Sequence, residues 1–170
     1  MTRLLLISDT HLPKRARALP AEVWDEVDHA DAVIHAGDWV DARLVTELAE
    51  RARRLVGVWG NNDGDDVRAL VPEIAHVEFD GIRFAVIHET GPAAKREERM
   101  DALFPDSDVL VFGHSHIPWD TTTERGLRLV NPGSPTDRRR QPACTYMVIT
   151  TGGEELEVEL HRLPLPARAT

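Results

Sequence analysis

The sequence is poor in cysteine, in positive charge and in long apolar runs. Its single cysteine, Cys144, excludes an internal disulfide and a cysteine-rich structural zinc site. A formal net charge of -9 over 170 residues argues against broad, charge-driven binding to nucleic acid or to anionic membranes. No apolar run approaches the ~20 residues of a membrane span, and the run at 4–7 is too short for a secretory signal. We therefore expect a cytoplasmic protein that does not act at a membrane.

The first part of the chain alternates predicted strands with predicted helices. Short apolar runs predict strands at 3–8, 31–37 and 54–60. Two amphipathic segments between them predict helices at 20–30 and 41–53. Asp41 is a plausible N-cap of the second helix. This β-α-β-α-β order is typical of a mostly parallel sheet covered by helices.

The second part of the chain favours antiparallel strands. Hairpins are predicted at 75–88, 119–131 and 145–161, with a helix at 92–104 and a strand at 108–113. Parallel units followed by antiparallel strands indicate an α/β protein with two sheets that face each other and helices outside. We find no repeat or linker, so we expect one domain over residues 1–163 and a flexible, Pro-rich tail at 164–170.

Side chains that can bind metals follow five of the predicted strands. They are Asp9, His11, Asp38, Asn61, His88, His114 and His116. Ligands of open α/β sheets bind at the edge where the strands end, so we expect these residues to converge. Asp-x-His and His-x-His would each point two side chains to one side of an extended segment.

The chemistry of this set is specific. Two carboxylates, four imidazoles and one amide oxygen, without a thiolate, suit Mn, Fe, Zn, Co or Ni. Seven donors exceed the needs of one tetrahedral ion and suffice for two ions if one carboxylate bridges. Without an ion, such a gathering would demand proton sharing and unmet hydrogen bonds. A lone Asp-x-His is usually a surface turn, but five such segments in this order favour a metal site.

Other polar residues remain open to two interpretations. His35 is either a partner of a metal ligand or a core residue of its strand. The basic segments at 14–17 and 137–140 either contact a substrate phosphate or are solvated surface charge.

The ordered pattern "SDTH…HAGD…GNND…IHE…GHSH…NPGS", from Ser8 to about Ser134, resembles the calcineurin-like metallophosphoesterases, especially their small YfcE-type phosphodiesterases. The resemblance implies a four-layer αββα sandwich of two mixed β-sheets flanked by helices. It also implies two divalent ions, with Mn²⁺ expected and Ni²⁺, Fe²⁺, Co²⁺ or Zn²⁺ as alternatives. One ion would be held by Asp9, His11, Asp38 and His116. The other would be held by Asp38 as a bridge, with Asn61, His88 and His114.

The implied activity is hydrolysis of a small phosphodiester by direct attack of a metal-bridging hydroxide, with no side chain identified as general acid. Two residues depart from the pattern of many relatives. Asn62 stands where they carry a histidine that protonates the leaving group, so we expect poor activity on phosphate monoesters and a substrate contact by Asn62. Glu89 stands where they commonly carry glycine, and it either narrows the pocket or faces solvent.

A scaffold is the alternative function, because a related fold serves as a subunit of the eukaryotic retromer with a degenerate metal site. That interpretation predicts missing ligands and an exposed apolar patch. All seven positions keep competent donors here, which favours an enzyme. The natural substrate and the oligomeric state are not indicated by the sequence, although an oligomer is compatible with it.

Overall fold

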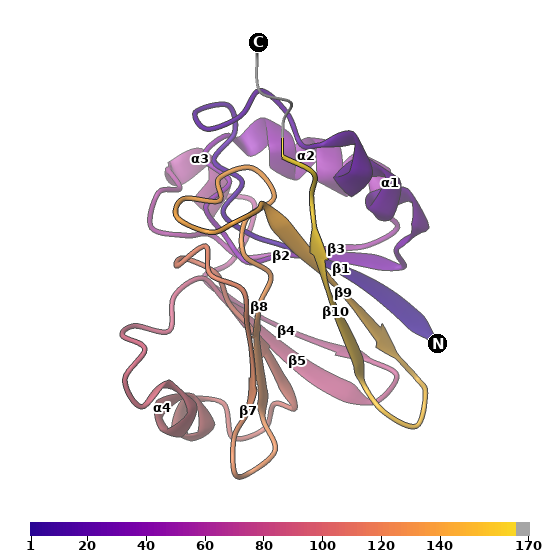
Figure 1. Cartoon of the computed structure of the whole chain (residues 1–170), viewed down its shortest axis with the longest axis vertical. Coiled ribbons are helices and arrows are strands. Elements are labelled where there is room, and N and C mark those ends of the chain that lie inside the picture. The colour runs from indigo at the N-terminus through magenta and orange to yellow at the C-terminus, as the bar shows by residue number, and fades with distance from the viewer. Residues whose placement is uncertain (166–170) are drawn as a thin grey trace.

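The computed structural model describes residues 1–165, and it consists of two five-stranded sheets packed face to face with helices on both outer faces (Figure 1). The first sheet has the strand order β10-β9-β1-β2-β3. Its strands are β1 (Thr2–Ile7), β2 (Ala32–His35), β3 (Leu55–Gly57), β9 (Thr145–Thr151) and β10 (Glu157–Arg162). The second has the order β4-β5-β6-β8-β7. Its strands are β4 (Ile74–Phe79), β5 (Ile82–Ile87), β6 (Val109–Val111), β7 (Trp119–Thr122) and β8 (Arg128–Asn131).

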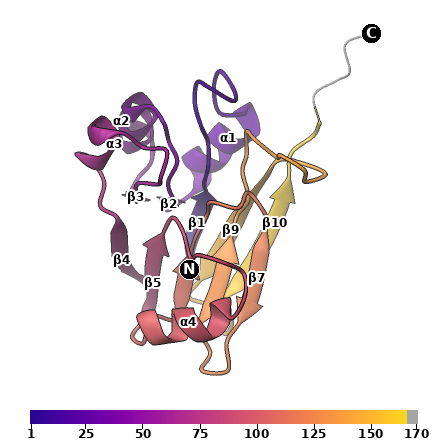
Figure 2. The same cartoon turned by 90° about the vertical axis from the view of Figure 1, so that its left-hand side faces the viewer.

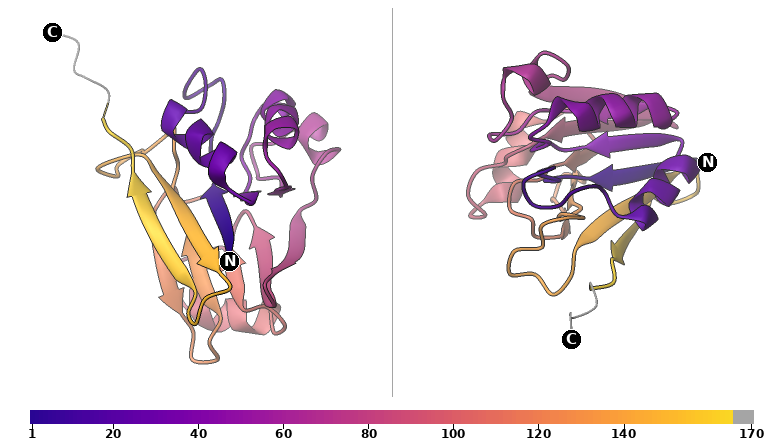
Figure 3. Two further views of the ribbon diagram at one scale, coloured as in Figure 1. Left: turned by 90° about the vertical axis from the view of Figure 1, so that its right-hand side faces the viewer. Right: turned by 90° about the horizontal axis from the view of Figure 1, so that it is seen from above.

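The helices complete four layers. They are α1 (Ala21–His29), α2 (Ala42–Arg51), α3 (Asp65–Arg68) and α4 (Arg96–Leu103). Figure 3 shows α1 and α2 lying along the outer face of the first sheet, and Figure 2 shows α4 at the outer face of the second. The predicted αββα sandwich is therefore confirmed. In the described residues, no helix is long and apolar enough to cross a membrane.

Three apolar clusters fill the spaces between the four layers. Alternate residues of β1 divide between two of them: Leu5 packs toward the helices, whereas Leu4 packs toward the second sheet. A third cluster lies between the second sheet and α4, around Met100 and Phe112. Burial on both faces explains why β1 and β2 are nearly continuous apolar runs rather than alternating ones.

The predicted elements are largely confirmed, with differences at their ends. Asp41 is the N-cap of α2, where its side chain accepts a hydrogen bond from the backbone N–H of Arg43 at 2.8 Å. The helix predicted at 92–104 begins only at Arg96. The single turn α3 was not predicted, because four residues carry too little periodicity. Of the predicted tail at 164–170, residues 166–170 lie outside the described residues.

Parallel pairing brings the ends of several strands to one edge of the sandwich. In the first sheet β1 pairs in parallel with β2, and β2 with β3. In the second sheet β5 pairs in parallel with β6, and β6 with β8. The loops that leave these strands therefore meet at a common edge, where both sheets contribute to one site.

Candidate metal centre

The loops that carry the predicted donors are tied to one another by backbone hydrogen bonds. The N–H of Asp9, after β1, donates to the carbonyl of Gly37, after β2, at 2.9 Å. The N–H of His11 donates to the carbonyl of Asp38 at 3.1 Å. In the second sheet the N–H of Gly113 donates to the carbonyl of His88 at 2.9 Å. These contacts hold the donors of each sheet at fixed separations.

Five of the seven donors have a left-handed backbone conformation. The φ angles are 56° at Asp9, 45° at His11, 60° at Asp38, 72° at His114 and 60° at His116. The expectation that Asp-x-His and His-x-His lie on extended segments is therefore wrong. Each of these five residues instead has a positive φ, so alternation along a strand does not set the direction of its side chain. Positive φ is uncommon outside glycine and costs free energy, and such residues cluster at functional sites.

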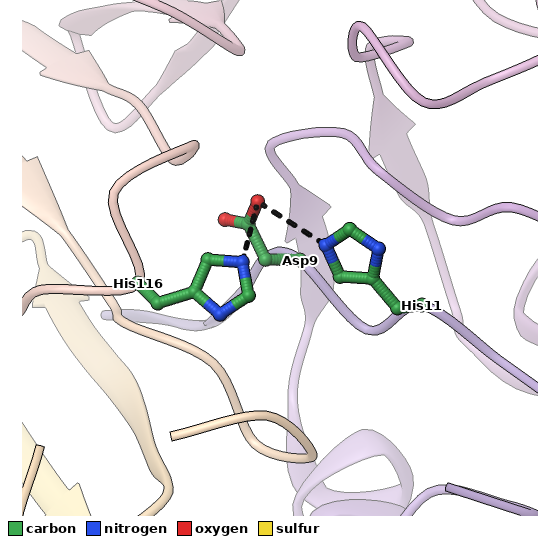
Figure 4. A group of neighbouring side chains, drawn as sticks. All are labelled: Asp9, His11 and His116. Atoms are coloured by element: carbon green, nitrogen blue, oxygen red, sulfur yellow. Dashed lines mark ion pairs between the residues drawn. The ribbon is translucent and has the colours of Figure 1, made fainter. Parts of the chain in front are cut away.

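The first group of donors consists of Asp9, His11 and His116 (Figure 4). Oδ1 of Asp9 lies 3.4 Å from Nε2 of His116 and 3.9 Å from Nε2 of His11. The other oxygen, Oδ2, accepts hydrogen bonds from Ser8 Oγ at 2.7 Å and from the N–H of His114 at 2.9 Å. The carboxylate is thus held by one oxygen while the second faces the two imidazoles.

The three facing atoms of this group are buried and have no hydrogen-bond partner. In residues 1–165 four buried side-chain atoms lack a partner, and three of them are Asp9 Oδ1, His11 Nε2 and His116 Nε2. Leaving buried polar atoms unpaired costs several kcal/mol in all, at about 1–3 kcal/mol each. A divalent cation between them removes this cost, so the residues present fit a metal ion.

Backbone carbonyls fix the orientation of two imidazoles. Nδ1 of His116 lies 2.6 Å from the carbonyl oxygen of Asp137, and Nδ1 of His88 lies 2.7 Å from that of Ala36. A carbonyl only accepts, so each Nδ1 is the protonated donor. In the neutral imidazole Nε2 then carries the free lone pair, which is the arrangement that metal-binding histidines use.

The second group of donors consists of Asp38, Asn61, His88 and His114. Asn61 Oδ1 lies 3.0 Å from Nε2 of His88 and 3.1 Å from Nδ1 of His114. Oδ2 of Asp38 lies 3.4 Å from Nε2 of His88 and also 3.4 Å from Nε2 of His11. Asp38 therefore lies between the two groups. Asp9 also reaches the second group, because its Oδ1 lies 3.9 Å from Nε2 of His88, and all seven predicted donors are brought to one place.

The charges of this cluster perturb its own ionisation. Burial alone would raise the pKa of Asp9, but the imidazoles of His11 and His116 hold it well below its usual range. Burial would also raise the pKa of Asp38, but His88 and Asn62 lower it to about 2. Burial would lower the pKa of His88, but the carboxylates of Asp38 and Asp9 raise it to about 9. A proton on His88 therefore supplies positive charge that a cation would otherwise provide.

Two positioning residues were not singled out from the sequence. Asp63 is buried, and its carboxylate accepts from the N–H groups of Asp38 at 2.9 Å, Gly60 at 2.7 Å and Val40 at 2.7 Å. It thereby joins the loops after β2 and β3, and burial raises its pKa. Ser134 Oγ donates to the carbonyl of Asp9 at 2.8 Å. The available signals were the "GNND" and "NPGS" motifs, which end in these two residues.

Two glycines permit the close approach of these loops. A Cβ on Gly60 would collide with the carboxylate of Asp38, and a Cβ on Gly113 would collide with Ser8 and with Asp9. Both positions therefore exclude any side chain as long as the donors keep their places.

The remaining residues of the sequence analysis lie around the donors. Asn62 holds both carboxylate oxygens of Asp38. Its side-chain amide donates to Oδ2 at 2.7 Å, and its backbone N–H donates to Oδ1 at 2.9 Å. His35 is fully buried beneath the site, 3.1 Å from Thr10 Oγ1 and stacked on Trp39, and burial lowers its pKa to about 3.

The two basic segments meet beside the first group of donors. Nε of Arg15 lies 3.5 Å from Oδ2 of Asp137, the residue whose carbonyl holds His116. The segments at 14–17 and 137–140 thus lie on the same side of the site.

Comparisons with known proteins agree with this geometry. Residues 2–154 match the calcineurin-like phosphoesterase superfamily domain, so the chain belongs to this superfamily. A probable metallophosphoesterase of Methanothermobacter thermautotrophicus is 35% identical over 95% of this chain and 92% of its own length. Phosphodiesterase MJ0936 of Methanocaldococcus jannaschii is 25% identical over 75% of this chain and 81% of its own. Chaetomium thermophilum Vps29 shares the fold, with a TM-score of 0.85, 19% identity and coverage of 100% and 93%.

Proposed function

We propose that this protein is a phosphodiesterase that depends on two divalent metal ions. Asp9, His11, Asp38 and His116 would hold the first ion. Asp38, Asn61, His88 and His114 would hold the second, with Mn²⁺ as the expected metal. The observation that carries the proposal is the set of three buried, unpartnered ligand atoms on Asp9, His11 and His116.

The chain's own residues prepare the site for this chemistry. Two divalent ions would supply a water activated as nucleophile and positive charge for the phosphoryl oxygens. Asp38 has one oxygen facing a histidine of each group, which suits it to be the shared ligand. Asn62 holds that carboxylate through two hydrogen bonds, so its position supports a role in orienting Asp38 as well as the substrate contact expected from the sequence.

A preference for diesters follows from the residue at position 62. An asparagine amide does not donate a proton at neutral pH, so an ester with a poor leaving group receives no help from it. A diester with an activated leaving group needs less assistance. The name of the Methanocaldococcus relative, a phosphodiesterase, supports the same preference.

The scaffold alternative is less well supported. The chain shares its fold with Vps29, but the likeness is at 19% identity and concerns the fold alone. A scaffold does not require seven ligand side chains to be kept together or three unpartnered buried atoms to be directed at one point. The donor set therefore favours an enzyme.

The test is hydrolysis of two esters by protein purified with Mn²⁺. Bis(4-nitrophenyl) phosphate should be turned over, glycerol 2-phosphate, a monoester with an alkoxide leaving group, should be turned over more slowly, and EDTA should stop both reactions. Elemental analysis should find two ions per chain. A protein that carries its metals and hydrolyses neither ester is not the enzyme we propose.

A further inference from the structure

A cavity of about 560 Å³ opens beside the second group of donors. Asn61 and His88 contribute to its wall, so an ester bound at the metal centre would extend directly into it. We call this cavity the substituent pocket. Its remaining walls come from β4, from the loop after β5 and from α4.

Part of the wall of the substituent pocket is apolar. It includes Trp59, Met100 and Phe104, together with two side chains that are unusually exposed. Leu103 is 66% exposed and Ile74 is 46% exposed. Apolar side chains that line an open cavity beside a reactive site are typical of a surface that a ligand covers.

Among the acidic and basic side chains that line the substituent pocket, negative charges outnumber positive ones. Glu73 and Glu89 line it, and Oε1 of Glu89 lies 3.7 Å from Nε2 of His114, at the boundary with the metal centre. Arg99 also lines it, but its guanidinium donates to the carbonyls of Thr90, Pro92 and Ala94. The arginine holds the loop after β5 and keeps its charge, but the two carboxylates outnumber it, and Glu89 remains half exposed.

We propose that the substituent pocket binds the organic group esterified to the phosphate, and that it accepts an apolar group that is neutral or cationic. Apolar walls bind the body of the group, and the carboxylate of Glu89 repels any second anionic group. The inference rests on the proposed function and adds the class of substrate. It excludes nucleoside polyphosphates and nucleic-acid strands, whose neighbouring phosphates would meet Glu89.

A matched series of 4-nitrophenyl phosphodiesters tests the proposal, because the leaving group is constant and only the second substituent changes. The substituents are 2-(trimethylammonio)ethyl, its neutral isostere 3,3-dimethylbutyl, the anionic 2-carboxyethyl and the small methyl group. For the Mn²⁺-loaded protein, kcat/KM should be higher for the trimethylammonio ester than for its neutral isostere, because Glu89 attracts the cation, and lower for the carboxyethyl ester by about tenfold, because Glu89 repels the anion.

Two variants and one control identify the responsible residues. Glu89→Gln should raise kcat/KM for the carboxyethyl ester by about fivefold relative to the dimethylbutyl ester, because the repulsive charge is gone. Glu78→Gln removes an equal charge from β4 outside this pocket and should leave the ratio unchanged. Leu103→Ala should raise KM for the dimethylbutyl ester but not for the methyl ester.

Two outcomes would overturn the proposal while leaving the proposed function intact. One is a ratio of anionic to neutral ester that Glu89→Gln does not change. The other is an equal loss of kcat on all four esters together with weaker Mn²⁺ binding, which would make Glu89 a positioning residue for His114. If no ester is hydrolysed by the loaded wild type, the proposed function itself fails.

Binding to the substituent pocket can also be measured without turnover. The chain has three methionines, so methyl-labelled methionine gives three resolvable NMR signals. Met100 lines the pocket, whereas Met147 lies in the core between the two sheets. In Zn²⁺-loaded protein, bis(3,3-dimethylbutyl) phosphate should shift the Met100 methyl signal in a saturable way and leave Met147 unmoved. A Met100 signal that stays in place contradicts the proposal.

Discussion

The two groups of donors differ in how they meet the solvent. Asp9, His11 and His116 are buried, and their facing atoms have no partner in the described residues. In the second group the side chain of His114 is 43% exposed, and Asn61 Oδ1 already lies within hydrogen-bond distance of two imidazoles. The first position is therefore dry and unsatisfied, whereas the second combines two buried donors, Asp38 and His88, with the more exposed His114 and Asn61.

Because of this difference, we expect the two positions to bind a cation with different affinities. A cation at the first position gains the full benefit of pairing atoms that are otherwise unpaired, so we expect tight binding there. A cation at the second position must replace existing hydrogen bonds and solvent, so we expect weaker binding. The second position also adjoins the substituent pocket. The cation that we expect to bind more weakly therefore lies where the substrate enters.

The largest effect should follow from removing Asp38, which lies between the two groups and is the proposed shared ligand. Asp38→Asn should lower Mn²⁺-dependent diester hydrolysis by roughly 10³-fold, the upper range for the loss of one electrostatic group at a reacting centre. Asp41→Asn, a nearby change of the same kind, should leave the rate unchanged, because asparagine also serves as an N-cap. Equal rates for both variants, measured with bis(4-nitrophenyl) phosphate, would argue against a shared ligand.

The second prediction concerns pH and the proton on His88. The folded-state pKa of His88, about 9, lies above the ordinary histidine value of 6.5. The metal-free protein should therefore be fully stabilised by this group below pH 6.5 and lose that contribution as the pH rises to about 9. The loss is at most about 3 kcal/mol of unfolding free energy.

Chemical denaturation of the metal-free protein across this pH range measures the effect. A His88→Gln variant should show a flatter profile, whereas His29→Gln, at an exposed helix end, should keep the wild-type slope. With Mn²⁺ bound the decline should be absent, because the ion then supplies the positive charge. A metal-free stability that rises between pH 6.5 and 9 would show that His88 is not the proton carrier.

The third prediction separates the two positions by metal affinity. Calorimetric titration of the wild type with Mn²⁺ should show two steps. His116→Ala should weaken the tighter step by at least about tenfold, since even the outer partners of metal ligands contribute about 10- to 100-fold. His114→Ala should weaken only the second step. The reverse assignment would mean that burial does not decide which position binds more tightly.

The smallest effect should come from a positioning residue. Asp63→Asn keeps the shape of the side chain but replaces one acceptor oxygen with a donor, so at least one of the backbone N–H groups of Asp38, Gly60 and Val40 loses its partner. We expect a loss of about 1–2 kcal/mol in unfolding free energy and a modest fall in kcat. Unchanged stability, with the loop conformation intact, would contradict this role for Asp63.

Much of this site could be predicted from the sequence because its donors follow strands. Asp9, Asp38 and His88 come shortly after apolar runs, and parallel strands end at a common edge. The prediction of the local backbone conformation was wrong, because His11 and His116 have positive φ rather than an extended conformation. A left-handed turn at a non-glycine residue is imposed by its surroundings, so no local pattern indicates it.

The substituent pocket could not be predicted in the same way. Trp59, Ile74 and the α4 pair Met100 and Leu103 lie on three separate segments, and each is an ordinary apolar residue in its own context. The cavity exists because β4 lies at the edge of the second sheet and α4 leaves part of that edge open, which depends on packing between distant elements. The exception is Glu89, whose departure from the pattern of relatives marked it from the outset.

Anomalous scattering from a crystal grown with Mn²⁺ is the most direct measurement of the central claim. The account predicts a strong peak among Asp9, His11, Asp38 and His116, and a weaker one among Asp38, Asn61, His88 and His114. A map with manganese elsewhere, or with these side chains unoccupied at saturating Mn²⁺, would contradict it.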